Sequence, residues 1–176
     1  MKKRWIALAA AGVVLAGCQT TARKPVETVS GVDLPRFMGP WYVIANIPTF
    51  IEKGAHEAVE TYRLQADGSV DIDFRYRAGS FDGEKKTLRS KGFIEDASNA
   101  VWGVQFVWPI RADYRITHLA ADYSQTVIAR EKRDYVWIMA RTPTIPEADL
   151  AKLIAFVGAQ GYDTAKIQRV PQASGK

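Results

Sequence analysis

The sequence predicts an all-β domain of eight antiparallel strands followed by a single α-helix. Between residues 39 and 141, apolar and polar side chains alternate with a period of two, the pattern of half-buried strands. Turn signals divide this stretch at intervals of roughly 8–14 residues, and after Pro143 the apolar residues change to helical spacing. A length of 176 residues with 47% hydrophobic and 24% charged side chains fits one folded globular domain.

The N-terminal segment has the pattern of a targeting signal rather than of a folded element. Residues 1–17 combine a basic start, a short apolar run and small residues at the end, as secretory signals do. The Leu-Ala-Gly-Cys sequence that ends at Cys18 is similar to a bacterial lipobox, in which the cysteine is acylated and becomes the new N-terminus. The alternative is a soluble periplasmic protein in which this cysteine is incidental.

The lipobox interpretation assigns residues 1–17 to a lipoprotein signal peptide, Cys18 to lipid attachment and residues 18–32 to a flexible lipidated tether. A membrane is then the expected partner of the N-terminus, because two or more acyl chains anchor a protein stably. In lipoproteins of this kind, an Asp after the cysteine retains the protein at the inner membrane. Gln19 therefore predicts a lipid-anchored protein of the bacterial outer membrane that faces the periplasm.

Removal of the signal peptide changes what the net charge indicates. The formal charge falls from +5 to +2, because residues 1–17 contain three basic residues and no acidic one. A charge this close to neutral gives no reason to expect a nucleic-acid partner. A single cysteine excludes an internal disulfide bond and a cysteine-cluster metal site, and two histidines offer few further ligands. We therefore predict neither a metal nor another cofactor.

The clearest strand lies in residues 68–77, where four apolar residues alternate with four charged ones. Asp67-Gly68 is a hairpin turn signal, and residues 57–64 supply the partner strand. A turn is expected over residues 109–113. The remaining strands show the same alternation and are predicted at 41–47, 87–94, 100–108, 114–120, 126–130 and 135–141. Eight such strands either close into a barrel or split into a sandwich, and alternation alone does not decide between them.

The residues after Pro143 predict one helix on the outside of the sheet. Pro146 suits the first helical position, and Gly161 suits the end of the helix. Residues 164–170 are expected to add a short edge strand. The apolar residues of the helix fall at i, i+3, i+4 and i+7 and form one stripe for packing: Leu150, Leu153, Ile154 and Val157.

Three short motifs, in order along the chain, resemble the signatures of the lipocalin family. The Gly-Pro-Trp-Tyr sequence that begins at Gly39 resembles the first signature, Asp122-Tyr123 the second, and the Arg-Thr-Pro sequence that begins at Arg141 the third. The chain is most similar to the bacterial outer-membrane lipocalins, which are lipoproteins, and to their apolipoprotein D-like relatives. In these proteins the pattern Arg-Asp-Tyr-x-Trp-Ile-x-x-Arg-Thr-Pro recurs, and here it occupies residues 133–143.

The resemblance implies an eight-stranded antiparallel up-and-down β-barrel over residues 33–171, with one C-terminal α-helix packed outside and residues 172–176 as a tail. It also implies a closed end of the barrel. There, Gly39 permits a tight backbone entry, Trp41 points inward and Arg141 lies over the tryptophan ring. We expect these three residues to close the barrel rather than to bind a ligand.

An inward-facing Trp41 fixes which residues line the barrel, because alternate side chains of a strand share a face. Val43 and Asn46 stand where Glu and Arg are common in the relatives, which argues against a polar ligand anchor on the first strand. In the relatives, the side chains that correspond to Trp137 and Tyr114 border the ligand. The candidate ligand-binding residues are Ala45, Phe74, Tyr76, Val104, Phe106, Tyr114, Tyr135, Trp137 and Met139.

The predicted lining is apolar, with a few hydroxyls and no carboxylate pair, which suits an acyl chain. The expected function is to bind and store or transport small hydrophobic ligands at the outer membrane, above all fatty acids or lysophospholipids, without catalysis.

Two alternatives stay open. One is a lipocalin-fold enzyme acting on a lipid or isoprenoid, for which the predicted interior offers only His118, tyrosines and hydroxyls. The other is a filled-barrel structural or interaction lipoprotein. A homodimer, as in some relatives, is a further candidate assembly.

Overall fold

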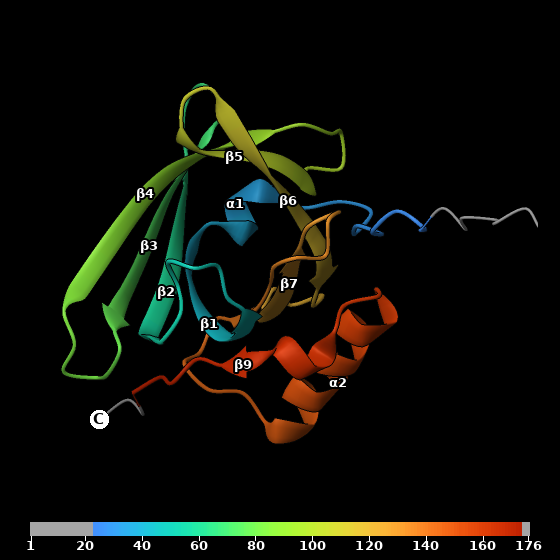
Figure 1. Ribbon diagram of the computed structural model, residues 1–176. Coiled ribbons are helices and arrows are strands. Elements are labelled where there is room, and N and C mark those ends of the chain that lie inside the picture. The colour runs from blue at the N-terminus through green and yellow to red at the C-terminus, as the bar shows by residue number, and fades with distance from the viewer. Residues whose placement is uncertain (1–22, 174–176) are drawn as a thin grey trace, which may run out of the picture.

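The computed structural model describes residues 23–173 (Figure 1), so the predicted signal peptide, Cys18 and Gln19 lie outside the described residues. The barrel strands are β1 (Gly39–Ile47), β2 (Ala55–Leu64), β3 (Val70–Ala78), β4 (Lys85–Ile94), β5 (Val101–Val107), β6 (Ile110–Leu119), β7 (Gln125–Ala129) and β8 (Val136–Ala140). Each strand pairs antiparallel with the next, and β1 pairs with both β2 and β8. The sheet therefore closes on itself, which confirms the predicted up-and-down barrel and excludes the sandwich.

Four further elements accompany the barrel. The short helix α1 (Leu34–Phe37) leads into β1, and α2 (Glu147–Ala159) lies against the outside of the barrel (Figure 1). The 3-10 turn η1 (Thr164–Lys166) and the short strand β9 (Gln168–Arg169) follow, and β9 pairs antiparallel with β1. Among the described residues, no helix is both long and apolar enough to cross a membrane.

The packing of α2 divides the buried residues into two hydrophobic cores. The interior core fills part of the barrel and includes Trp41 and Tyr62. The outer core lies between α2 and the strands β1, β7 and β8, and it includes Ile138 and Leu153. These three strands are thus buried on both faces, which explains why their sequences are nearly continuous apolar runs.

Two irregularities in strand pairing turn predicted interior side chains outward. The pairing of β1 with β8 shifts register between Val43 and Ala45, and Ala45 lies in the outer core with α2. The prediction that Ala45 lines the barrel interior is therefore wrong, because alternation holds only until a bulge inserts an extra residue. A second shift separates Ile116 from His118, and the His118 ring packs on Phe156 of α2 with centroids 5.4 Å apart.

The end of the barrel beside α1 is closed by Trp41 and Arg141. Trp41 is fully buried, and its indole Nε1 donates a hydrogen bond to the carbonyl of Phe37 over 2.8 Å. The guanidinium carbon of Arg141 lies 3.8 Å from the centre of the Trp41 ring, and Nη1 donates to the carbonyl of Pro40 over 2.8 Å. Gly39 has a φ of +91°, a left-handed conformation that glycine adopts without steric cost.

Tyr123 joins the closed end from the turn between β6 and β7. Its hydroxyl accepts a hydrogen bond from the backbone N–H of Asp33 over 2.9 Å, and the guanidinium of Arg36 lies 4.1 Å from the centre of its ring. Three motifs that are far apart in the sequence therefore meet around α1.

The segments on either side of the barrel are docked on it. Val26 and Val32 are buried, and the backbone N–H of Val29 donates to a carbonyl of β6 over 3.0 Å. The described part of the predicted flexible tether, 18–32, is thus packed rather than free, because its valines bury apolar surface on the barrel. The predicted tail is also held, since the side-chain amide of Gln172 donates to carbonyls of β1 and β2 over 2.9 and 3.0 Å.

Candidate ligand-binding cavity

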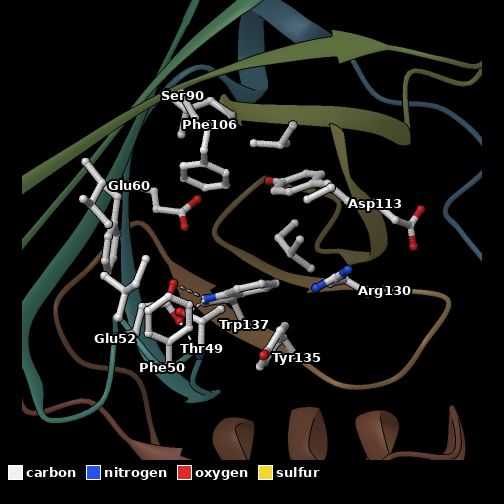
Figure 2. Close-up of a pocket in the computed structure, with 18 residues that line it drawn as sticks. Thr49, Phe50, Glu52, Glu60, Ser90, Phe106, Asp113, Arg130, Tyr135 and Trp137 are labelled. Carbon is white, nitrogen blue, oxygen red and sulfur yellow. Dashed lines mark hydrogen bonds between the residues drawn. The ribbon is translucent and has the colours of Figure 1, made fainter. Parts of the chain in front are cut away.

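The barrel contains a cavity of about 200 Å³ in the half remote from α1. The strands run alternately up and down, so the β1–β2 and β7–β8 loops lie at the end opposite α1. Both loops supply lining residues, and the β-strands supply the rest of the wall (Figure 2). The lining is mostly apolar, which is typical of pockets for small organic ligands.

Six of the nine candidate ligand-binding residues lie on the cavity wall: Phe74, Val104, Phe106, Tyr114, Tyr135 and Trp137. The other three do not. Ala45 faces α2, as described above, whereas Met139 and Tyr76 belong to the interior core without lining the cavity. The Tyr76 hydroxyl instead donates to the carbonyl of Ile51 over 3.3 Å. Facing inward is therefore not sufficient to reach the cavity, since neighbouring side chains cover part of the inner wall.

Aromatic rings fill the closed half of the barrel and form the floor of the cavity. Phe37 packs against Trp41, Tyr62 and Trp102, with ring centroids 5.2, 5.4 and 5.7 Å apart. Trp102 in turn stacks on Tyr114 at 5.0 Å. The interior is consequently solid at one end and hollow at the other.

The mouth of the cavity carries exposed apolar side chains. Phe50, in the β1–β2 loop, is 80% exposed, and Trp108, in the β5–β6 hairpin, is 82% exposed. β6 begins at Ile110, so the turn predicted over 109–113 is wrong and this hairpin is tighter and longer than expected. The apolar surface of the cavity thus continues onto the rim of the barrel.

Three acidic side chains line the cavity, those of Glu52, Glu60 and Asp113, which corrects the prediction of an interior without a carboxylate pair. The first, Glu52, is buried where the β1–β2 loop turns back into the barrel. Its oxygens accept hydrogen bonds from the backbone N–H of Thr49 over 3.0 Å and from Nε1 of Trp137 over 3.2 Å. Burial raises the pKa of this carboxyl, in opposition to these hydrogen bonds.

The second carboxylate, Glu60, lies in the middle of β2 and points into the cavity (Figure 2). A chain of hydrogen bonds ends on it, because the Tyr114 hydroxyl donates to the Tyr62 hydroxyl over 2.9 Å and Tyr62 donates to Oε2 of Glu60. Burial raises the pKa of the Glu60 carboxyl to about 7, the hydrogen bond from Tyr62 opposes this rise, and the charge of Glu52 adds to it.

The inward position of Glu60 could have been found by counting outward from the turn at Asp67-Gly68. That register pairs Glu60 with Phe74, whose inward direction was predicted, and partners in an antiparallel pair share a face. Glu52 had no such signal, because a loop residue has no periodicity to reveal its direction.

Arg130 is a basic residue on the cavity wall. Its Nη1 lies 3.3 Å from a carboxylate oxygen of Asp134, while its Nε is buried and has no hydrogen-bond partner within residues 23–173. Across the same residues, no group of three or more His, Cys, Asp or Glu side chains is arranged to hold a metal ion.

A closed barrel with one filled end, one hollow end and a helix outside defines a class of protein, the β-barrel that can enclose a small ligand. Over residues 32–172 the chain matches the lipocalin-like domain family. The chain therefore belongs to the lipocalin family.

Comparisons with individual proteins support membership of the lipocalin family. The chain is 30% identical to the outer membrane lipoprotein Blc of Citrobacter freundii over 166 residues, which cover 94% of each chain. It is 26% identical to apolipoprotein D of Mus musculus, covering 91% of this chain and 92% of the relative. Among solved structures, insecticyanin of the tobacco hornworm Manduca sexta shares the fold with a TM-score of 0.64 at 14% identity, covering 85% of each chain.

Proposed function

We propose that this lipocalin binds a small hydrophobic ligand in the barrel cavity and stores or transports it at the bacterial outer membrane. The ligand classes that we favour are fatty acids and lysophospholipids. The observation that supports this function best is the cavity itself, a mostly apolar space of about 200 Å³ between a floor of packed aromatic rings and an apolar rim.

The size of the cavity suits part of a lipid rather than a whole one. An apolar cavity of about 150 Å³ inside a protein accommodates a benzene molecule, so the space here takes a slightly larger group. The exposed rim residues Phe50 and Trp108 extend the apolar surface for the remainder of a chain. Each CH₂ group of the ligand that is buried contributes about 0.8 kcal/mol to the free energy of binding. After the cost of ordering the ligand chain is subtracted, the sum is consistent with micromolar affinity.

A ligand titration tests this function. Purified, delipidated protein is titrated with a lysophospholipid while tryptophan fluorescence is recorded. We expect a saturable change, because Trp137 lies on the cavity wall. Trp137→Phe should remove most of that change, whereas the matched control Trp41→Phe, at the closed end of the barrel and away from the cavity wall, should retain it. Absence of a saturable change, together with no lipid in an organic extract of the protein, would contradict the proposal.

The location at the outer membrane rests on the lipobox at Cys18, on Gln19, and on relatives that are named outer membrane lipoproteins. We expect Cys18→Ser to move the protein from the membrane fraction to the soluble fraction of the cell envelope, measured by fractionation and immunoblotting. Gln19→Asp should leave the protein lipidated but move it to the inner-membrane fraction. Retention of the Cys18→Ser variant in the outer membrane would refute the lipid anchor.

The hollow half of the barrel argues against the filled-barrel alternative. The relatives are lipocalins rather than typical enzymes, and we propose no catalytic step. The homodimer stays a prediction.

A further inference from the structure

We propose that the cavity seats a protonated amine on an apolar ligand, with the ammonium group held between the carboxylates of Glu52 and Glu60. This inference rests on the proposed function, since it assumes that the cavity binds a ligand, and it adds which polar group that ligand carries. The two carboxylates come from different elements, the β1–β2 loop and β2, yet both line the same cavity.

Glu60 is arranged as a hydrogen-bond acceptor. Tyr114 and Tyr62 both donate in the direction of its carboxylate, and burial raises the pKa of both phenols, so both remain neutral donors. Only Oε2 is used by this chain of hydrogen bonds. Oε1 has no hydrogen-bond partner within residues 23–173, and Figure 2 shows the carboxylate pointing into the cavity. One oxygen of a desolvated carboxylate is therefore left for a donor that the ligand brings.

Glu52 faces the same space with its orientation fixed. The backbone N–H of Thr49 and the indole of Trp137 hold its carboxylate at the cavity wall. Two carboxylates that line one apolar cavity repel each other, and the charge of Glu52 accordingly raises the pKa of Glu60. A cation placed between them removes this repulsion and forms charge-assisted hydrogen bonds.

The other charged groups on the cavity wall do not neutralise this pair. Arg130 forms an ion pair with Asp134, and Asp113 accepts hydrogen bonds from Arg115 over 2.9 and 3.2 Å. Tyr62 and Tyr114 carry no charge near neutral pH, because burial raises the pKa of both phenols. The carboxylate of a free fatty acid is consequently repelled by Glu52 and Glu60, whereas an amine is attracted. Of the two ligand classes proposed above, this site therefore disfavours the fatty acids.

The experiment compares three ligands that share one chain and differ in the head group: decylamine, decanol and decanoate. Each is titrated at about pH 8, where an alkyl amine is protonated, with tryptophan fluorescence as the readout and with concentrations kept below aggregation. We expect decylamine to bind about tenfold more tightly than decanol, since a hydrogen bond to a charged group contributes about 1.5–3 kcal/mol, and decanoate to bind least tightly.

Variants connect the preference to the two carboxylates. Glu60→Gln and Glu52→Gln should each bring decylamine to within about threefold of decanol, by loss of the charge-assisted bond. The matched control Glu84→Gln makes the same charge change at a residue whose side chain is 77% exposed and pairs with Lys86 at 3.7 Å, and it should retain the full preference.

The outcomes separate this inference from the proposed function. If decanol binds and decylamine binds no better, the amine site is refuted while the apolar cavity stands. An amine preference that survives in both glutamine variants places the amine elsewhere and also refutes the site. If none of the three ligands binds and the lysophospholipid titration fails as well, both proposals are refuted.

Discussion

Trp41→Ala is expected to lower the free energy of unfolding by about 3–5 kcal/mol, the usual cost of removing a large buried aromatic side chain. The loss has several parts. The fully buried ring packs on Phe37 at 5.2 Å, its indole donates to the Phe37 carbonyl, and the guanidinium of Arg141 lies on its face. Without the ring, the closed end of the barrel contains a cavity, and Arg141 loses a cation–π contact worth about 0.5–2 kcal/mol.

The measurement is urea-induced unfolding followed by circular dichroism, because the substitution removes a fluorescent residue. The control is Trp108→Ala, which deletes the same side chain from a position that is 82% exposed. It should change stability by no more than about 0.5 kcal/mol. If Trp41→Ala does not fold, Trp41→Phe should still lower the unfolding midpoint. A loss below about 1 kcal/mol for Trp41→Ala would show that Trp41 does not hold the closed end together.

Glu60→Gln is expected to stabilise the protein by about 3 kcal/mol near pH 8 and to lose that advantage near pH 4. The pKa of Glu60 is raised from 4.5 to about 7 by burial, so the folded state binds the proton more tightly than the unfolded state does. The stability that comes from protonated Glu60 is fully present below pH 4.5 and is lost as the pH rises through about 7. Each unit of pKa difference corresponds to about 1.4 kcal/mol.

Glutamine has the shape of the protonated acid and still accepts from Tyr62, but it does not ionise. The difference in unfolding free energy between the variant and the wild type should therefore grow with pH between about 4.5 and 7 and be constant above that range. Denaturant unfolding at several pH values measures it. Glu84→Gln, at an exposed position, should show no such growth. A difference independent of pH would mean that Glu60 titrates at its ordinary pKa.

The fold was largely predictable because its signals are local. The strand at 68–77 shows an uninterrupted alternation, and the structure places β3 at Val70–Ala78. The helix was predicted from a stripe that includes Leu150 and Val157, and both residues are buried in the outer core. Such patterns need only a few neighbouring residues, so they survive without knowledge of the tertiary structure.

The candidate site was predictable only in part. The inward direction of Trp137 and Tyr114 followed from alternation, and both side chains line the cavity. Glu60 was missed because a strand with polar residues on both faces does not indicate which face is buried. Its neighbours across the sheet, Trp41 and Phe74, decide its direction.

The sequence alone determined the number and order of the strands, the outer helix and, through the lipocalin motifs, the closure of the barrel at Arg141. Only the tertiary structure decided that Ala45 turns outward, that Glu52 folds back into the cavity and that the segment around Val29 docks on β6. The physical reason is the range of the interactions. Alternation and helical periodicity show which face of a strand or helix is apolar, and they depend only on neighbouring residues. The direction of a bulge, a loop or a docked segment is set by contacts with residues far away in the chain. Those residues come into contact only when the barrel closes.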